Sequence, residues 1–330
     1  MKTKFKYYYK PSEKRQKEFD DKCVFILDTN VLLDLLRLDK DLTEKALKCF
    51  SENKERIRIP YYVGIEYHKD FRKVVIDQSR SFKETAKKIN AQTFINNIFS
   101  ALSSIRFSEA RKNKIKEAFA APTQLVIDEI NSLVNYFTEL SEKTDLQEKI
   151  ADALDGMIFD ELTAEQIAGY EKEGEERYNQ QIPPGYKDKN KRTNKYGDLI
   201  IWREILEYAK EHQVDICFVS RDLKEDWQEL HEGKVLCPRY ELQREFQLIA
   251  PKCYFKTMTL DRMLEMLNDG FTSEEIMDVK ALEEEILTKI SSKDESDEEL
   301  EEENEIIAGE STEALKGANK NDMVNVSKAK

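Results

Sequence analysis

Cys23 to Leu38 reads CVFILDTNVLLDLLRL, and the spacing of its apolar residues changes in the middle. The continuous apolar run from Val24 to Leu27 is typical of a strand buried on both faces, as in a parallel sheet. Asp28 ends this run, and the apolar residues then recur at helical spacing, with Thr29 or Asn30 available as the N-cap. We therefore predict a strand, an acidic turn and a helix, which places Asp28 where open α/β sheets bind ligands. The alternative left open is that Asp28 is only a turn or capping residue.

The composition limits the classes of protein that the chain can belong to. Its 330 residues are 40% apolar, enough for one large core or two modest ones. No apolar run approaches the ~20 residues of a membrane span, and the amino terminus lacks the apolar core of a signal peptide. We therefore expect a cytoplasmic protein without a membrane partner. The five cysteines include no C-x-x-C pair and the three histidines are scattered, so any metal would be a hard cation held by carboxylates.

The net charge of -13 is distributed unevenly along the chain. Residues 281–330 contain fifteen acids and six lysines, a local charge of -9, and the sequence beyond about Ser291 lacks helical periodicity. We predict a folded domain over residues 1–280 and a disordered acidic tail over 281–330. Within the domain, Lys69 to Lys116 holds twelve basic residues against four acids, a local charge of +8. This asymmetry suggests a polyanionic partner for the basic part, although a solvated helix face is the alternative.

The remaining patterns predict alternating strands and helices around a long helical segment. A helix over residues 42–52 precedes a short strand, Arg56 to Ile59, and Val63 to Val74 then forms a helix with Glu66 near its first turn. Residues 75–185 have the apolar spacing and charge content of long helices, which indicates a helical insertion. A later helix is predicted from Asp198 to about residue 211.

A second strand followed by an acid comes late in the chain. Another buried strand is predicted over Asp215 to Val219 and is followed by SRDLKEDW. This repeats the strand, acid, helix pattern and predicts that Asp222 and Asp226 share one helical face. Residues 253–255 are predicted as the last strand and residues 260–267 as the last helix.

Four carboxylates are predicted to meet at one edge of the sheet. Asp28 and Asp222 follow buried strands, whereas Glu66 and Asp198 lie in the opening turns of helices beside the sheet. Right-handed crossovers bring the carboxyl ends of parallel strands to one edge. Clustered carboxylates raise one another's pKa unless a cation neutralises them. Mg²⁺ or Mn²⁺ held by carboxylates and water is suited to phosphodiester hydrolysis.

Several motifs over residues 23–270 resemble the PIN (PilT N-terminus) nuclease family. They are FILDTNVLL from Phe25, YGDLIIW from Tyr196 and VSRDLKEDW from Val219, in this order. PPGYKDK from Pro183 and PRYELQREF from Pro238 are similar to the bacterial PIN-like branch, which carries a long helical insertion. The resemblance implies a three-layer α/β fold with a central parallel sheet of order 3-2-1-4-5. It also implies dependence on Mg²⁺ or Mn²⁺ and endonucleolytic cleavage of RNA, more rarely of DNA.

The resemblance also assigns roles to residues of this chain. Asp28, Glu66, Asp198 and Asp222 take the catalytic and metal-binding positions, Asp226 is an auxiliary acid, and Asn30 orients Asp28. The charge pattern predicts that the insertion's basic stretch and one loop line the substrate path. The basic residues of that loop are Lys187, Lys189, Lys191, Arg192 and Lys195. We further expect cleavage to be restrained either by an inhibitory partner or by the acidic tail, which would compete with nucleic acid. A homo-oligomer is a separate alternative left open.

Each assignment has a plainer alternative. Glu66 is also placed where a helix dipole favours an acid, Asp198 is a good N-cap, and Asp188 reads as a loop residue between lysines. Tyr61, Tyr62 and Tyr186 suit either base stacking or packing. Two other function classes remain. One is a phosphotransfer or receiver domain, which does not explain VSRDLKEDW, and the other is a catalytically silent nucleic-acid-binding or regulatory protein.

Overall fold

The structure is a computed structural model that separates into two compact units, residues 1–276 and 277–330. It describes residues 1, 4–88, 96, 97, 99, 100, 106–142, 145–221, 224–232, 234–267 and 270–288. Residues 277–288, the described part of the second unit, are helical. Asp222 and most of the acidic tail lie outside the described residues, so the expectations for the tail stay predictions.

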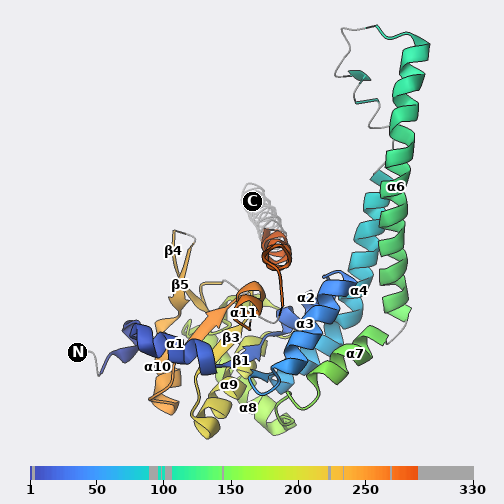
Figure 1. The fold of residues 1–330 in the computed structure, drawn as a ribbon. Coiled ribbons are helices and arrows are strands. Elements are labelled where there is room, and N and C mark those ends of the chain that lie inside the picture. Colours follow the sequence, from blue (N-terminus) through green and yellow to red (C-terminus); the bar gives the residue numbers. More distant parts are fainter. Residues whose placement is uncertain are drawn as a thin grey trace, which may run out of the picture. The chain divides into compact units, whose positions relative to one another are not determined.

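The first unit alternates helices and strands (Figure 1). Its opening elements are η1 (Lys6–Tyr8), α1 (Glu13–Lys22), β1 (Val24–Leu27), α2 (Thr29–Asp34), α3 (Lys40–Glu52), β2 (Ile57–Arg58) and α4 (Tyr61–Lys88). The middle of the chain contains α6 (Glu109–Glu142), α7 (Asp145–Leu154), α8 (Ala164–Asn179), η2 (Tyr186–Asn190) and α9 (Gly197–His212). The last elements are β3 (Ile216–Val219), β4 (Gln228–His231), β5 (Lys234–Pro238), α10 (Tyr240–Ile249), β6 (Phe255–Met258) and α11 (Leu260–Leu267).

A parallel sheet of order β2-β1-β3-β6 forms the centre of this unit. Phe25 pairs with Ile57 and with Cys217, and Val219 pairs with Met258. All residues of β1 and β3 are buried, so helices cover both faces of the central strands. The predicted α/β fold with a central parallel sheet is confirmed.

The sheet differs from the expected five-stranded one only beside β2, where a single bridge takes the place of the outer strand. Ile59, just after β2, forms an isolated parallel bridge with Ile158. Its N–H donates to the carbonyl of Met157 at 3.0 Å, and its carbonyl accepts from the N–H of Phe159 at 2.9 Å. Numbered along the chain with this bridge as the third strand, the sheet has the order 3-2-1-4-5. The expected edge strand is thus reduced to one bridging residue.

The helical insertion consists mainly of the far part of α4 together with α6, α7 and α8. In Figure 1, α6 packs along α4. Phe82 and Phe137 stack with ring centroids 5.3 Å apart, and Ser79 and Thr138 hydrogen-bond at 3.1 Å. Among the described helices, none has a stretch long and apolar enough to cross a membrane.

The segment after β3 is not the predicted helix. Residues 225–227 form a turn, and β4 and β5 then pair as an antiparallel hairpin. Trp227 explains the difference, because its ring stacks on Phe218 at 4.9 Å and meets Trp202 of α9 edge-on at 6.2 Å. Burying this ring in the core fixes the chain close to the sheet. Asp226 is consequently buried beside Trp227 and lies in a turn, so the prediction that it lies on a helical face is wrong.

Several element boundaries also differ from the predictions. Asp28, rather than Thr29 or Asn30, is the N-cap of α2, and α2 already ends at Asp34. Glu66 lies in the second turn of α4, because this helix begins at Tyr61. The last strand is Phe255–Met258 instead of residues 253–255.

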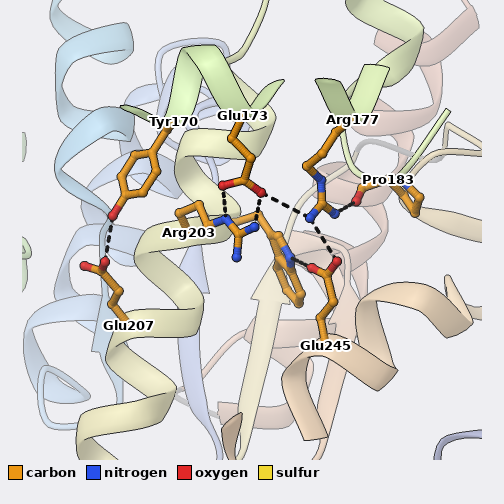
Figure 2. Close-up of polar contacts among 8 residues, drawn as sticks. Tyr170, Glu173, Arg177, Pro183, Arg203, Glu207 and Glu245 are labelled. Atoms are coloured by element: carbon orange, nitrogen blue, oxygen red, sulfur yellow. Dashed lines mark hydrogen bonds and ion pairs between the residues drawn. The ribbon is translucent and has the colours of Figure 1, made fainter. Parts of the chain in front are cut away.

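A polar network holds α8 against α9 and α10 (Figure 2). Glu173 of α8 accepts hydrogen bonds from Arg203 of α9 and forms an ion pair with Arg177 at 3.4 Å. Arg177 also pairs with Glu245 of α10 at 2.9 Å and donates to the carbonyl of Pro183. Since Pro183 begins the loop that leads into η2, this network positions that loop relative to α9.

Candidate functional site

Three hydrogen bonds from described residues hold the Asp28 carboxylate at the end of β1. Its Oδ1 accepts from the N–H of Thr29 at 2.7 Å. Its Oδ2 accepts from the side-chain amide of Asn30 at 2.5 Å and from the hydroxyl of Ser220 at 2.7 Å. The Asn30 amide also donates to Ser220 Oγ at 2.9 Å. Asp28 therefore caps α2 with one oxygen while Ser220, at the end of β3, fixes the other.

Glu66 joins the same group of residues from α4. Its Oε2 accepts from the hydroxyl of Thr29, and its Oε1 accepts from the side-chain amide of Asn194. Burial raises the pKa of Glu66, and these two hydrogen bonds partly offset that rise. Within the described residues, Glu66 accepts only from these neutral donors and forms no ion pair. A carboxylate held in this way would be stabilised by a cation.

Asp198 is brought to this group by a glycine. Gly197 begins α9, and a Cβ atom at this position would lie 2.6 Å from Oε1 of Glu66. Only the lack of a side chain lets the start of α9 approach Glu66 so closely. Asp198 follows directly, as the second residue of the helix. Its expected place in the opening turn is correct, but Tyr196 occupies the N-cap position.

A second glycine lets the loop before η2 approach Asp198. Gly185 has a φ of +84°, and a Cβ here would lie 2.9 Å from the Cβ of Asp198 and would also strike the hydroxyl of Tyr178. The Tyr178 side chain is 2% exposed. Burial raises its pKa most, followed by the charges of Asp198, Asp188 and Asp226. The charges of three acids from separate segments therefore act on this hydroxyl.

Asp188 and Asp226 have different partners. Asp188 is buried in η2, where it pairs with Lys191 at 2.5 Å and Lys224 at 3.2 Å, so it is a structural ion-pair residue within the loop. Asp226 accepts the backbone N–H of Lys187 at 3.1 Å. Through these contacts the turn before β4 holds η2 in place.

The chain just before Asp222 is fixed by an ion pair in the core. Asp34 of α2 is 1% exposed and accepts Nε of Arg221 at 2.7 Å and Nη1 of Arg37 at 2.7 Å. The N–H of Arg221 donates to Oδ1 of Asn30 at 3.2 Å. Asp222 itself lies outside the described residues, so its predicted role as a ligand stays a prediction.

Glu204 links α9 to the start of α4. This buried carboxylate accepts the backbone N–H groups of Tyr61 at 2.7 Å and Tyr62 at 3.1 Å. Burial raises its pKa from 4.5 to about 7, against the lowering effect of these hydrogen bonds. Glu204 thus caps the helix that carries Glu66.

The basic loop is partly paired. Lys187 pairs with Glu225 at 2.6 Å and Lys191 with Asp188, whereas Lys189 and Arg192 are exposed. Lys195 lies over the ring of Tyr196 at 5.1 Å. Lys189 and Arg192 are therefore the best placed of the five predicted substrate-binding residues for contact with a polyanion.

The predicted aromatic residues are partly engaged within the protein. Tyr62 donates its hydroxyl proton to Asn194 at 2.9 Å, and burial followed by the charge of Glu66 raises its pKa to about 12. Tyr61 and Tyr186 are half-buried. Packing therefore accounts for much of their surface.

Within the described residues, hydrogen bonds and one close backbone approach connect three of the four predicted acids. Thr29 bonds to both Asp28 and Glu66, and Gly197 places Asp198 next to Glu66. Among the described residues, no group of three or more His, Cys, Asp or Glu side chains is arranged to hold a metal ion by itself. The donor chemistry nevertheless fits Mg²⁺ or Mn²⁺, because carboxylate oxygens are hard ligands.

Apart from Asn30, the neutral residues of the site were not predicted from the sequence. Thr29, Ser220 and Asn194 donate to the carboxylates, yet only their positions beside the acids in LDTN, VSRD and TNKYGD could have suggested them. The Asp34–Arg221 pair had no sequence signal, because its members are 187 residues apart.

The comparison with family models identifies the class of this protein. The family model described as "PIN like domain" matches residues 24–242. The chain belongs to this family, as its motifs and sheet indicated. Membership indicates a nuclease-type or nucleic-acid-related function. Comparison with curated proteins gave no match, and comparison with solved structures gave none either.

Proposed function

We propose that this protein is a metal-dependent endonuclease that hydrolyses phosphodiester bonds, with RNA favoured over DNA. The observation that carries this proposal is the link through Thr29. This residue hydrogen-bonds to Asp28 at the end of β1 and to Glu66 of α4, next to the start of α9. Thr29 and the start of α9 thus connect acids from three separate segments of a PIN-like fold, which supports the proposal.

Asp28, Glu66 and Asp198 would hold a divalent cation, with Asp222 as the fourth ligand. Mg²⁺ or Mn²⁺ bound there would activate water for attack on the phosphorus atom and stabilise the leaving oxygen. The role of the protein is to position the ligands. Ser220 and Asn30 fix one oxygen of Asp28, while Asn194 fixes one oxygen of Glu66.

The substrate-binding surface follows from charge. Lys189 and Arg192 are exposed on the loop that leads to Asp198, where their charges would bind phosphate groups. The basic stretch from Lys69 to Lys116 includes much of α4, the helix that carries Glu66, and the start of α6. We propose that both lie along the path of the nucleic acid.

A cleavage assay on the full chain tests this function. End-labelled RNA and DNA, single-stranded and hairpin, are incubated with Mg²⁺, Mn²⁺ or EDTA. We expect internal cuts in RNA that require the metal and are abolished by EDTA. Binding of RNA without cleavage in either metal would contradict the proposal and favour the silent nucleic-acid-binding alternative.

A further inference from the structure

The first ten residues form an aromatic and basic segment that the proposed site does not use. Residues 1–12 contain four lysines and no acid, and residues 5–9 contain four aromatic rings. Lys4 and Lys10 are exposed. Phe5 is 44% exposed and Tyr8 is 54% exposed, which is unusual for large rings on a folded domain.

The rings of this segment lie against one another and against α10. Tyr7 and Tyr8 have centroids 4.6 Å apart, and Phe5 lies 6.4 Å from each of them. Tyr8 contacts the ring of Tyr240, the first residue of α10, at 4.5 Å. We call Phe5, Tyr7, Tyr8 and Tyr240 the aromatic platform.

The segment is anchored to the folded domain. Lys6 donates from Nζ to the carbonyl of Pro251 at 3.0 Å, and the same nitrogen lies 4.4 Å from the centre of the Tyr254 ring. The N–H of Tyr9 closes the turn onto the carbonyl of Lys6. In Figure 1 the amino-terminal segment accordingly lies beside α10. A ligand would therefore meet rings that are already ordered, which lowers the entropic cost of binding.

The charges around the platform favour a polyanion. Two acids lie beside Tyr240, and both are paired with the same arginine. Arg239 lies 3.4 Å from Glu229 and 2.8 Å from Glu241. Arg239 balances one of these two acids, so one net negative charge remains on this side, against the three described lysines of the amino-terminal segment, Lys4, Lys6 and Lys10.

A continuous series of contacts leads from the platform to the candidate site. The N–H of Arg239, next to Tyr240, donates to the carbonyl of Trp227 at 2.9 Å. Asp226 precedes Trp227 and accepts the N–H of Lys187 in η2. The loop carrying η2 reaches Asp198 through Gly185. The turn at Asp226 and Trp227 and the loop that carries η2 therefore connect the platform to the carboxylates of the candidate site.

We propose that the aromatic platform binds unpaired bases of a single-stranded nucleic acid by stacking, while Lys4 and Lys10 bind the phosphates between them. Every base has a flat face, so stacking of this kind tolerates any sequence. The inference rests on the proposed function only in taking nucleic acid as the ligand. It assigns to the enzyme a preference for single-stranded regions at one side of the cleavage site.

The test measures binding in EDTA, so that cleavage does not interfere. Short single-stranded RNA and DNA and a duplex of the same sequence carry 2-aminopurine, whose fluorescence is quenched when the base stacks. We expect Phe5→Leu with Tyr8→Leu to weaken binding of single strands about tenfold and to remove the quenching, with little change for the duplex. The matched control is Phe5→Tyr with Tyr8→Phe, which keeps both rings and should bind like wild type.

Unchanged single-strand affinity and quenching in the leucine variant would contradict the proposal that the aromatic platform binds bases. So would a loss of self-association in that variant without loss of binding, because the rings would then serve a second copy of this chain. If single strands bind through the rings but no nucleic acid is cleaved with metal, the platform stands and the proposed function fails. If RNA is cleaved and the leucine variant still binds normally, the platform fails and the proposed function stands.

Discussion

The hydroxyl of Thr29 donates a hydrogen bond to Oε2 of Glu66, which joins the residue after Asp28 to the second turn of α4. The backbone N–H of Thr29 donates to Asp28 at the same time. Thr29, an uncharged residue, therefore sets the position of two acids that are far apart in sequence. Neither acid is neutralised by this residue, so the arrangement leaves negative charge for a cation to balance.

Gly197→Ala should damage the site while leaving the fold intact. Alanine suits the first turn of a helix, but its Cβ would lie 2.6 Å from Oε1 of Glu66. We expect cleavage to fall about a hundredfold, as misplacement of reacting groups by about 1 Å does. Gly64→Ala is the matched control, since a Cβ there meets nothing within 4 Å and lies on the same helix as Glu66. It should stabilise by about 0.5–1 kcal/mol and retain activity, whereas equal activity in both variants would contradict the geometry.

Asp34→Asn should lower the free energy of unfolding by about 3 kcal/mol, because it leaves the buried Arg221 and the half-buried Arg37 without a counter-charge. Urea denaturation measures the change. Lys48→Ala serves as the control, since its ion pair with Glu52 is exposed and should contribute less than about 0.5 kcal/mol. A loss in Asp34→Asn no larger than in this control would show that the buried pair does not hold the segment before Asp222.

Glu204 should make the stability of the protein depend on pH. Its pKa is about 7 in the folded state and near 4.5 otherwise, so its protonated form is favoured by folding. This contribution is fully present below pH 4.5 and is lost as the pH rises through about 7, a change of up to about 3 kcal/mol. Glu204→Gln keeps an acceptor for Tyr61 and does not titrate. Unfolding free energies measured from about pH 5 to 8 should fall less steeply in this variant, and identical slopes would contradict the burial argument.

Lys189→Ala with Arg192→Ala should weaken nucleic-acid binding at low salt and reduce its salt dependence. Each lost phosphate contact lowers the slope of log K against log salt by about 0.7–0.9. Lys54→Ala with Lys210→Ala removes two exposed charges at the opposite edge of the sheet, before β2 and at the end of α9. The slope should change only in the first pair. An unchanged slope in the Lys189→Ala, Arg192→Ala variant would show that this loop is a solvated surface that does not bind nucleic acid.

The central strands were predictable because burial leaves a strong pattern in the sequence. Val24 to Leu27 and Ile216 to Val219 are continuous apolar runs, and all their residues are buried. Parallel pairing then follows from the helices between them, and it brings Asp28 beside Ser220. The edge of the sheet was harder to predict from the sequence, because β2 has two residues and its outer neighbour is a single bridge at Ile158.

The segment after β3 could not be predicted in the same way. Helical spacing of Asp222 and Asp226 is a local signal, whereas Trp227 is fixed by contacts with Phe218 and Trp202 from other elements. Tertiary packing of a large ring outweighs a weak helical pattern. The glycines beside Asp198 could not be predicted for a similar reason. Gly185 and Gly197 are required because residues from other segments lie close to them, and the local sequence does not reveal these neighbours.

The most direct test of the central claim is the rate of RNA cleavage as a function of Mn²⁺ concentration, measured for wild type, Asp28→Asn, Glu66→Gln and Asp198→Asn. Each substitution removes a charge and preserves shape, and thermal unfolding confirms that the variants fold. We expect each variant to cleave at least about a hundredfold more slowly at saturating substrate, with partial recovery at high Mn²⁺. Wild-type cleavage with unchanged metal dependence in Asp28→Asn would contradict the claim that these acids form a metal-dependent nuclease site.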